Sequence, residues 1–210
     1  MATLTAGAAG IDFDNLVVGD LLLGDVTVAT ASQFTLRDGA WLEEFTGQFT
    51  YSNGSISGGT VSSWTESLSG QMVFKITGAS VAVTDLATWA ATNNNAAAKA
   101  AFLGGADSLV GSQAADRMFG FGGNDTISGG GGSNYLRGDD GDDSIAGGAN
   151  FDDINGNVGN DTAHGNDGDD WVVGGKDQDL LFGDAGFDIV YGNMGDDTVS
   201  GGAGADWVRG

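Results

Sequence analysis

Residues 156–173, GNVGNDTAHGNDGDDWVV, hold two consecutive copies of a nine-residue pattern that fills the second half of the chain. In each copy an aspartate follows a glycine by five positions, and an apolar residue follows the aspartate by two. Three columns that stay in register over about 100 residues indicate a repeat array. The acidic or amide position recurs as Asp107, Asp116, Asp125, Asn134, Asp143, Asp152, Asp161, Asp170, Asp179, Asp188, Asp197 and Asp206.

The full pattern is G-G-x-G-x-D-x-U-x, where U is apolar, and it resembles the calcium-binding nonapeptide of RTX proteins. The resemblance covers half of the chain and implies a parallel β-roll over residues 104–210, with Ca²⁺ as the bound ion. It also implies export by type I secretion, and hence an extracellular or cell-surface location. The apolar column argues against a disordered acidic tail, because a disordered segment has no reason to keep one position apolar in every copy.

Each repeat is expected to contain one strand and one turn. The x-U-x segment predicts a three-residue strand whose central side chain points inward and whose neighbours point outward. The other six residues reverse the chain, which requires backbone angles open to glycine and tolerated by asparagine and aspartate. Two repeats make one coil, so residues two repeats apart stack, and roughly six coils about 4.8 Å apart form a roll of about 30 Å.

Stacked aspartates would repel one another without a cation, and hard oxygen ligands select Ca²⁺. The resemblance implies one ion between adjacent turns, held by both aspartates, by the second and fourth carbonyls of the lower turn and by the first and third carbonyls of the upper turn. Up to nine ions would bring a charge of +18 against −16 in residues 104–210, so this half is expected to fold only with calcium. The predicted calcium-binding residues are the acidic and amide column from Asp116 to Asp206 and the glycines Gly123, Gly129, Gly132, Gly138, Gly141, Gly147, Gly156, Gly159, Gly165, Gly168, Gly174, Gly183, Gly186, Gly192, Gly195, Gly201 and Gly204.

Departures from the pattern predict weak places in the roll. Asn134 lacks the charge of an aspartate, and Phe121 replaces a second-position glycine. The fourth position holds Ala114, Asn150 and Asp177, of which the alanine tolerates a positive φ worst. The first coils are therefore the ones expected to lack well-formed calcium sites. The small side chain of Ala163 predicts a thin core at its coil.

Composition narrows the classes of function. The chain has 29 acidic and 7 basic residues, a net charge of −22 and no cysteine. Such acidity argues against nucleic acid or an anionic membrane as the partner. The lack of cysteine rules out disulfides, and bound metal is one other source of cross-links. No stretch predicts a transmembrane helix, and the first residues do not read as a secretory signal peptide. The lone His164 and the adjacent Glu43 and Glu44 match no catalytic motif, so no enzymatic activity is expected.

Residues 1–84 are expected to form a small antiparallel β-sandwich or barrel. Segments 26–28, 48–51, 72–76 and 80–83 predict strands, residues 21–23 a buried run, Asn53–Gly54 a hairpin turn, and Gly58–Gly59 and Gly70 further breaks. Residues 85–103 predict two short helices, capped by Asp85 and Asn95, that link this domain to the roll and could cover its first coil. The expected core aromatics, for which a sugar-binding face is the alternative, are Trp41, Phe45, Phe49, Trp64 and Phe74.

The two outward faces of the roll differ in composition. One face is mostly small and polar, whereas the other carries Arg117, Phe119, Tyr135, Arg137, Asp153, Asn155, Trp171, Val173, Ile189, Tyr191, Trp207 and Arg209. Such an aromatic face predicts a contact, either with another subunit or with the N-terminal domain folded back over it. The expected function is a secreted calcium-binding structural protein that assembles head-to-tail into a filament or matrix. The alternative is a calcium-folded export module of a larger hydrolase or adhesin, with a glycan or cell-surface contact through the N-terminal domain.

Overall fold

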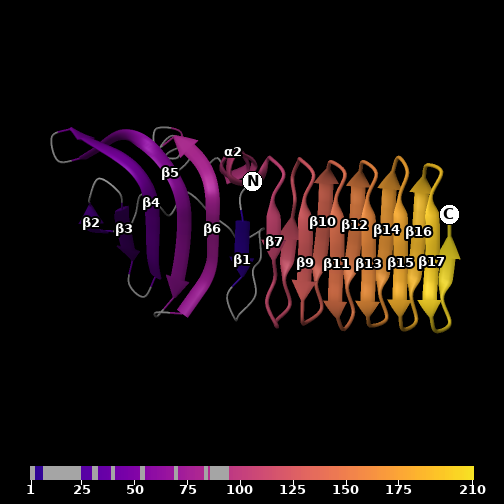
Figure 1. Cartoon of the computed structure of the whole chain (residues 1–210). Coiled ribbons are helices and arrows are strands. Elements are labelled where there is room, and N and C mark those ends of the chain that lie inside the picture. Colours follow the sequence, from indigo (N-terminus) through magenta and orange to yellow (C-terminus); the bar gives the residue numbers. More distant parts are fainter. Residues whose placement is uncertain are drawn as a thin grey trace.

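The computed structural model describes residues 3–6, 25–29, 33–38, 41–52, 55–68, 71–82, 85 and 95–210. An antiparallel sheet, one helix and a parallel roll follow one another along the long axis of the molecule (Figure 1), which confirms the predicted all-β fold class. The N-terminal elements are β1 (Thr3–Ala6), β2 (Asp25–Ala29), β3 (Gln33–Asp38), β4 (Trp41–Ser52), β5 (Ser55–Leu68), β6 (Gln71–Ala82) and α2 (Asn95–Leu103).

Strands β2 to β6 lie in one antiparallel sheet, with each strand paired to the next. Residues 26–28, 48–51 and 72–76 are strand as predicted, and the pairing of Ser52 with Ser55 confirms the hairpin. Gly58 and Gly59 do not interrupt the strand as predicted, because β5 runs through them with a register shift nearby. Residues 21–23, 53–54 and 86–91 lie outside the described residues, and the proposed division into three domains stays a prediction.

The predicted aromatic core is confirmed where side chains are described. Phe45, Phe49 and Trp64 are buried, and the rings of Phe45 and Trp64 stack with centroids 5.7 Å apart. Helix α2 packs onto this core through Phe102, whose ring lies 5.8 Å from that of Trp64. The side chains of Trp41 and Phe74 lie outside the described part of the chain. Helix α2 confirms the predicted second helix, and burial of Phe102 and Leu103 joins it to the same core as the roll.

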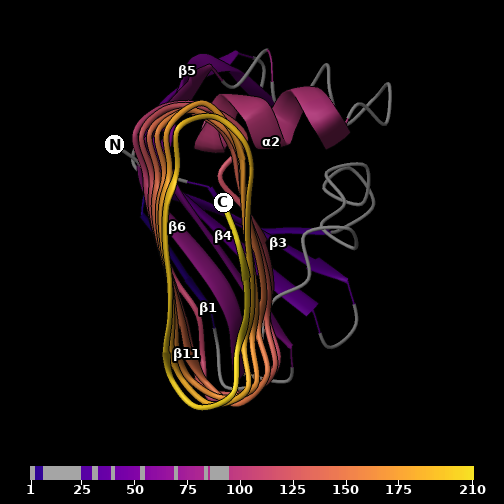
Figure 2. The ribbon, with the colours of Figure 1, turned by 90° about the vertical axis from the view of Figure 1, so that its right-hand side faces the viewer.

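Strand β1 joins the two halves of the protein. It pairs antiparallel with β6 and parallel with β7, the first strand of the roll. One sheet of twelve strands therefore runs from the N-terminal half into one face of the roll, and a second sheet of six strands forms the other face. Figure 2, a view rotated by 90°, shows the coils superposed as one elongated loop with the N-terminal strands beyond it. The edge of the first coil in the long sheet is thereby paired with β1 and not exposed.

The roll repeats with the predicted spacing. In every parallel pair between two strands of the roll the partner lies 18 residues away, as Ile145 does from Ala163. The predicted strand length is wrong: most strands span six residues and run past x-U-x into the first three residues of the next repeat. The strand pairing skips the first glycine of each repeat and continues at the second residue, so only three residues are left for the turn. The roll strands are β7 (Ser108–Val110), β8 (Arg117–Phe119), β9 (Thr126–Gly130), β10 (Tyr135–Asp140), β11 (Ser144–Ala149), β12 (Asp153–Val158), β13 (Thr162–Asp167), β14 (Trp171–Lys176), β15 (Leu180–Ala185), β16 (Ile189–Met194), β17 (Thr198–Ala203) and β18 (Trp207–Arg209).

The apolar column forms the core of the roll. Ten of its residues, from Leu109 to Val190, are at most 1% exposed, whereas Val208 in the last coil is 45% exposed. Alternation along each strand explains the burial, because U and the following glycine face inward while their neighbours face outward. The column thus supplies the hydrophobic stabilisation of the roll and holds the turns in register at both narrow edges.

Candidate functional site

The turns at the two edges depend on left-handed backbone at two positions of each repeat. From the third repeat on, the second and fourth positions both have positive φ, as in Asn157 (79°) and Gly159 (130°). Asn150 and Asp177 adopt φ of 70° and 76°, which confirms that asparagine and aspartate replace the fourth glycine. Phe121 is also left-handed, with φ of 69°, whereas Ala114 is not among the positive-φ residues. The first complete turn, at residues 111–116, therefore has a different shape from the others.

The sixth-position side chains form two hydrogen-bonded ladders, one along each edge. The backbone N–H of each residue donates to the Oδ1 atom of its counterpart 18 residues later, for example Asp143 to Asp161 at 2.9 Å. Ten such bonds of 2.7–3.1 Å run along the roll. One oxygen of each carboxyl group is thus used to join consecutive coils.

The second carboxyl oxygen, Oδ2, is left without a hydrogen-bond donor in most turns. Each of these atoms lies against the first glycine of its own turn, where a Cβ atom would collide with it. The carbonyl of the first glycine in the next coil faces the same place, as that of Gly165 does beside Gly147 and Asp152. The turns with a buried, unsatisfied Oδ2 atom are those of Asp125, Asp143, Asp152, Asp161, Asp170, Asp179, Asp188 and Asp197.

Burial makes most of these carboxyl groups hard to ionise without a cation, and repulsion between neighbouring aspartates adds to the effect in several of them. Burial, together with repulsion from neighbouring aspartates in the same ladder, raises the pKa of Asp125 and Asp170 from 3.8 to about 7. Burial likewise raises the pKa of Asp143, Asp152, Asp161 and Asp179 to about 6 and shifts that of Asp188 upward. The hydrogen bond to Oδ1 lowers each pKa but does not cancel the effect of burial.

Backbone carbonyls also converge on these turns. Those of the second and fourth positions point at the matching glycine of the next coil, as Gly130 does at Gly148 and Gly141 at Gly159. The third-position carbonyl of the upper turn accepts a hydrogen bond from the fourth-position N–H of the lower turn, at 2.8 Å from Gly141 to Val158. Its second lone pair stays available.

The donor set fits a hard divalent cation. Each ladder interval presents unsatisfied carboxylate oxygen and several carbonyl oxygens, which are the ligands of Ca²⁺. Among the described residues no three acidic or histidine side chains meet at one point, and each turn places one carboxylate in its ladder. The structure brings the predicted aspartates and glycines together at the two edges. Their individual roles as calcium ligands stay a prediction.

The second ladder runs through residues 116, 134, 152, 170, 188 and 206, and its first two side chains do not suit an ion. The Oδ2 atom of Asp116 accepts hydrogen bonds from the backbone N–H and the hydroxyl of Ser112, at 2.7 and 3.1 Å. Asn134 places its amide nitrogen 3.5 Å from the carbonyl of Gly147, where other turns place Oδ2. Both turns are therefore satisfied by protein donors. The contribution of Ser112 was missed from the sequence, although a serine four residues before an aspartate is a recognisable donor.

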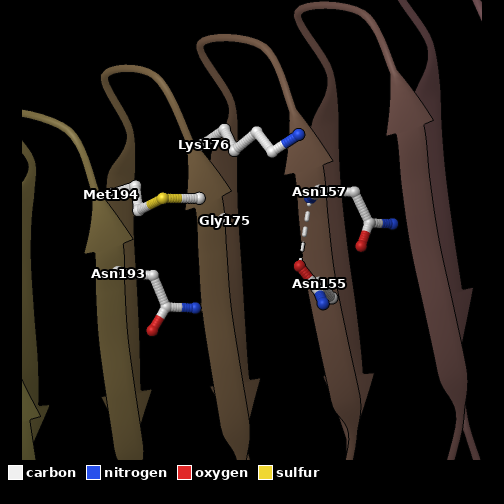
Figure 3. Close-up of a pocket in the computed structure, with 6 residues that line it drawn as sticks. All are labelled: Asn155, Asn157, Gly175, Lys176, Asn193 and Met194. Atoms are coloured by element: carbon white, nitrogen blue, oxygen red, sulfur yellow. Dashed lines mark hydrogen bonds between the residues drawn. The ribbon is translucent and has the colours of Figure 1, made fainter.

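The outward face of the six-stranded sheet remains open in the later coils. Trp171 and Trp207 are 45% and 65% exposed, and the described N-terminal strands continue the long sheet and do not fold back over this face. A shallow groove of about 400 Å³ lies on the same face (Figure 3), lined by Asn155, Asn157, Gly175, Lys176, Asn193 and Met194. The N–H of Asn157 donates to Asn155, and its side-chain amide donates to Asp139. The groove thus marks the gap that Gly175 leaves between Asn157 and Asn193.

On the opposite face, His164 lies 2.8 Å from Asp184 and stacks on Phe182 with centroids 4.5 Å apart. This is an outward position, as predicted. Within the described residues, no helix is long and apolar enough to cross a membrane.

Comparison with known proteins agrees with the geometry. The model of the RTX calcium-binding nonapeptide repeat matches residues 103–136, 119–154, 128–162, 147–181 and 174–208, which together cover half of the chain. No curated protein and no solved structure is significantly similar to it. In this chain the repeat forms a register of 18 residues, left-handed turns and two carboxylate ladders. The chain therefore belongs to the family of proteins with RTX calcium-binding nonapeptide repeats, and residues 103–208 form its calcium-binding β-roll module.

Proposed function

We propose that the chain is a secreted structural protein whose roll folds when Ca²⁺ enters the two ladders. The observation that supports this best is the row of eight buried Oδ2 atoms without a donor. An ionised carboxylate buried without a partner is strongly unfavourable, and stacking eight of them in two columns is more so. A divalent ion between turns neutralises two carboxylates at once, so binding energy becomes folding energy.

The ions would be held by the aspartates of adjacent turns together with the carbonyls of the glycine-rich positions. When bound, calcium supplies positive charge and a cross-link between coils. The chain's own residues prepare the site: the Oδ1 hydrogen bonds fix each carboxyl group, and the apolar column sets the distance between coils. With no cysteine in the chain, bound ions take the place that disulfides hold in other extracellular proteins.

An extracellular setting suits this mechanism. Extracellular calcium modules bind with dissociation constants of about 10⁻⁴–10⁻³ M, so a roll tuned to that range stays unfolded where calcium is scarce and folds after export. RTX repeats are typical of secreted proteins, and the family assignment supports the same location. The role is structural and not catalytic in this proposal.

Self-association is the further part of the proposal, and it rests on the exposed face of the six-stranded sheet. Trp171 and Trp207 lie in one column of that face, and exposed aromatic surface of this kind marks interaction sites. A second copy of the chain is the proposed partner, and ordered assembly would produce a filament or matrix. The rival is an export module of a larger secreted hydrolase or adhesin, which needs no contact between rolls.

Circular dichroism and small-angle X-ray scattering in calcium and in EGTA test the folding step. We expect β-structure and a compact, elongated particle in calcium, and an expanded chain from residue 140 onward in EGTA. An equally compact particle in both solutions would refute the proposal. Sedimentation of the wild type and of the Trp171→Ser/Trp207→Ser variant in calcium tests assembly separately, because monomeric wild-type protein would leave only the export-module function.

A further inference from the structure

We infer that the first coils of the roll close without calcium and act as a preformed seed on which the calcium-dependent coils fold. The inference rests on the proposed calcium-dependent folding and states where it begins. It concerns the N-terminal end of the second ladder, where Asp116 and Asn134 directly precede β8 and β10 of the six-stranded sheet.

The first argument for the seed is that protein hydrogen-bond donors replace a cation at the start of the second ladder. The spacing of the repeats allows nine intervals between complete turns, five of them in the second ladder. The two intervals bounded by Asn134 differ from the rest, because its neutral amide donates toward the carbonyl of Gly147 and leaves no charge to neutralise. In the lower of these intervals Ser112 already donates two hydrogen bonds to Asp116. Protein donors thus take the place of the cation, and seven of the nine intervals are left to bind Ca²⁺.

Side chains on the outer face tie the same coils together. The ring of Tyr135 lies between two guanidinium groups, with the central carbon of Arg117 at 3.9 Å and that of Arg137 at 3.5 Å from its centroid. Arg137 also forms an ion pair of 2.9 Å with Asp153 and donates to the backbone carbonyls of Leu136 and Asp153. These contacts connect β8, β10 and β12, and none of them requires a metal.

The opposite face of the first coil is also held by protein. Strand β1 pairs with β7 through three residues and with β6 along its other edge, so β7 belongs to the N-terminal sheet as much as to the roll. Buried Phe102 and Leu103 of α2 share a core with Leu109 and Met118. A chain that has lost its calcium therefore keeps an edge to which the next coil can add, in the way that repeat proteins propagate from a formed neighbour.

Two measurements on the full chain test the inference. Native mass spectrometry at saturating calcium counts the ions, and we expect seven and not nine. Hydrogen exchange in EGTA maps residual structure, and we expect protected amides in β8 and β10 and unprotected amides in β14 and β16. The variant Asn134→Asp restores the missing carboxylate, so we expect it to bind at least one more ion and to lose the metal-free protection of β8 and β10 by about tenfold or more. Asn124→Asp is the matched control, because it adds the same charge at an exposed position of the neighbouring turn.

The inference would be overturned if the wild type bound nine ions, or if every strand lost its protection equally in EGTA. An Asn134→Asp variant that behaves as Asn124→Asp does would overturn it as well. These results differ from failure of the proposed function, in which calcium would order no part of the roll.

Discussion

Replacing three aspartates of one ladder with asparagine should have opposite effects with and without calcium. Asp143, Asp161 and Asp179 follow one another along the first ladder, and each is at most 3% exposed. Burial raises the pKa of each from 3.8 to about 6 in the metal-free roll. These groups therefore favour the fold while they are protonated below pH 3.8, and that contribution is lost as the pH rises through about 6.

The magnitude follows from the size of the shift. A pKa that is higher by about two in the folded roll lowers the free energy of unfolding by about 3 kcal/mol per ionised aspartate at pH 7.5. Asparagine keeps the side-chain oxygen that accepts the N–H of the previous coil and brings an amide that can donate to a carbonyl, as Asn134 does with Asp116 N–H and the Gly147 carbonyl. We expect the metal-free triple variant to be more stable than the metal-free wild type by several kcal/mol, with less than the full sum because neighbours in one ladder are coupled.

Circular dichroism in EGTA during a pH titration measures this effect, and the variant should keep its roll to a higher pH than the wild type does. In calcium the order reverses, because each substitution removes a charged ligand, and urea denaturation should show the variant as the less stable protein. The control is Asp142→Asn/Asp169→Asn/Asp196→Asn, which removes the same charge at exposed positions directly before ladder aspartates. Equal behaviour of the two triple variants would refute the reasoning, because net charge alone would then explain the result.

Three further predictions concern the pH dependence of calcium binding, a glycine in a turn and a leucine in the core of the roll. Calcium affinity, measured by titration calorimetry, should fall steadily as the pH is lowered from about 7 to 5, since protons compete for Asp125 and Asp170, whose pKa is raised to about 7; an affinity independent of pH would contradict this. Gly165→Ala places a Cβ atom 2.5 Å from Asp170 Oδ2 and 2.6 Å from the carbonyl oxygen of Gly183, so calcium-induced folding should fail, whereas Gly122→Ala, with no atom closer than 3.7 Å, should fold. Leu181→Ala empties a fully buried position and should lower the free energy of unfolding in calcium by about 2–5 kcal/mol, while Leu180→Ala, 38% exposed, should change it far less.

Much of the fold could be predicted from the repeat pattern, because its constraints are local and recur in every copy. The register follows from the nine-residue period, and the inward column follows from an apolar residue kept in every copy, as the burial of Leu109 to Val190 confirms. Strand length was wrong because the first three residues of each repeat were assigned to the turn on the strength of their glycines. In the roll that segment is extended and pairs with its neighbours, and only its second residue is left-handed.

The parts that could not be predicted depend on contacts between distant segments. Strand β1 has only four residues, and its identity as a strand depends on β6 and β7, which lie far along the chain. The aspartate ladders were predicted as a set, and the sequence indicated weak first coils. It did not indicate that Ser112 satisfies Asp116, or that Tyr135 lies between two arginines, since both depend on side-chain directions in the folded roll.

Anomalous X-ray diffraction from crystals grown in calcium tests the central claim most directly. We predict anomalous peaks between stacked turns of both ladders, each next to the Oδ2 atoms that lack a hydrogen-bond donor. A fully formed roll with no anomalous peak beside Asp161 or Asp170 would contradict the account.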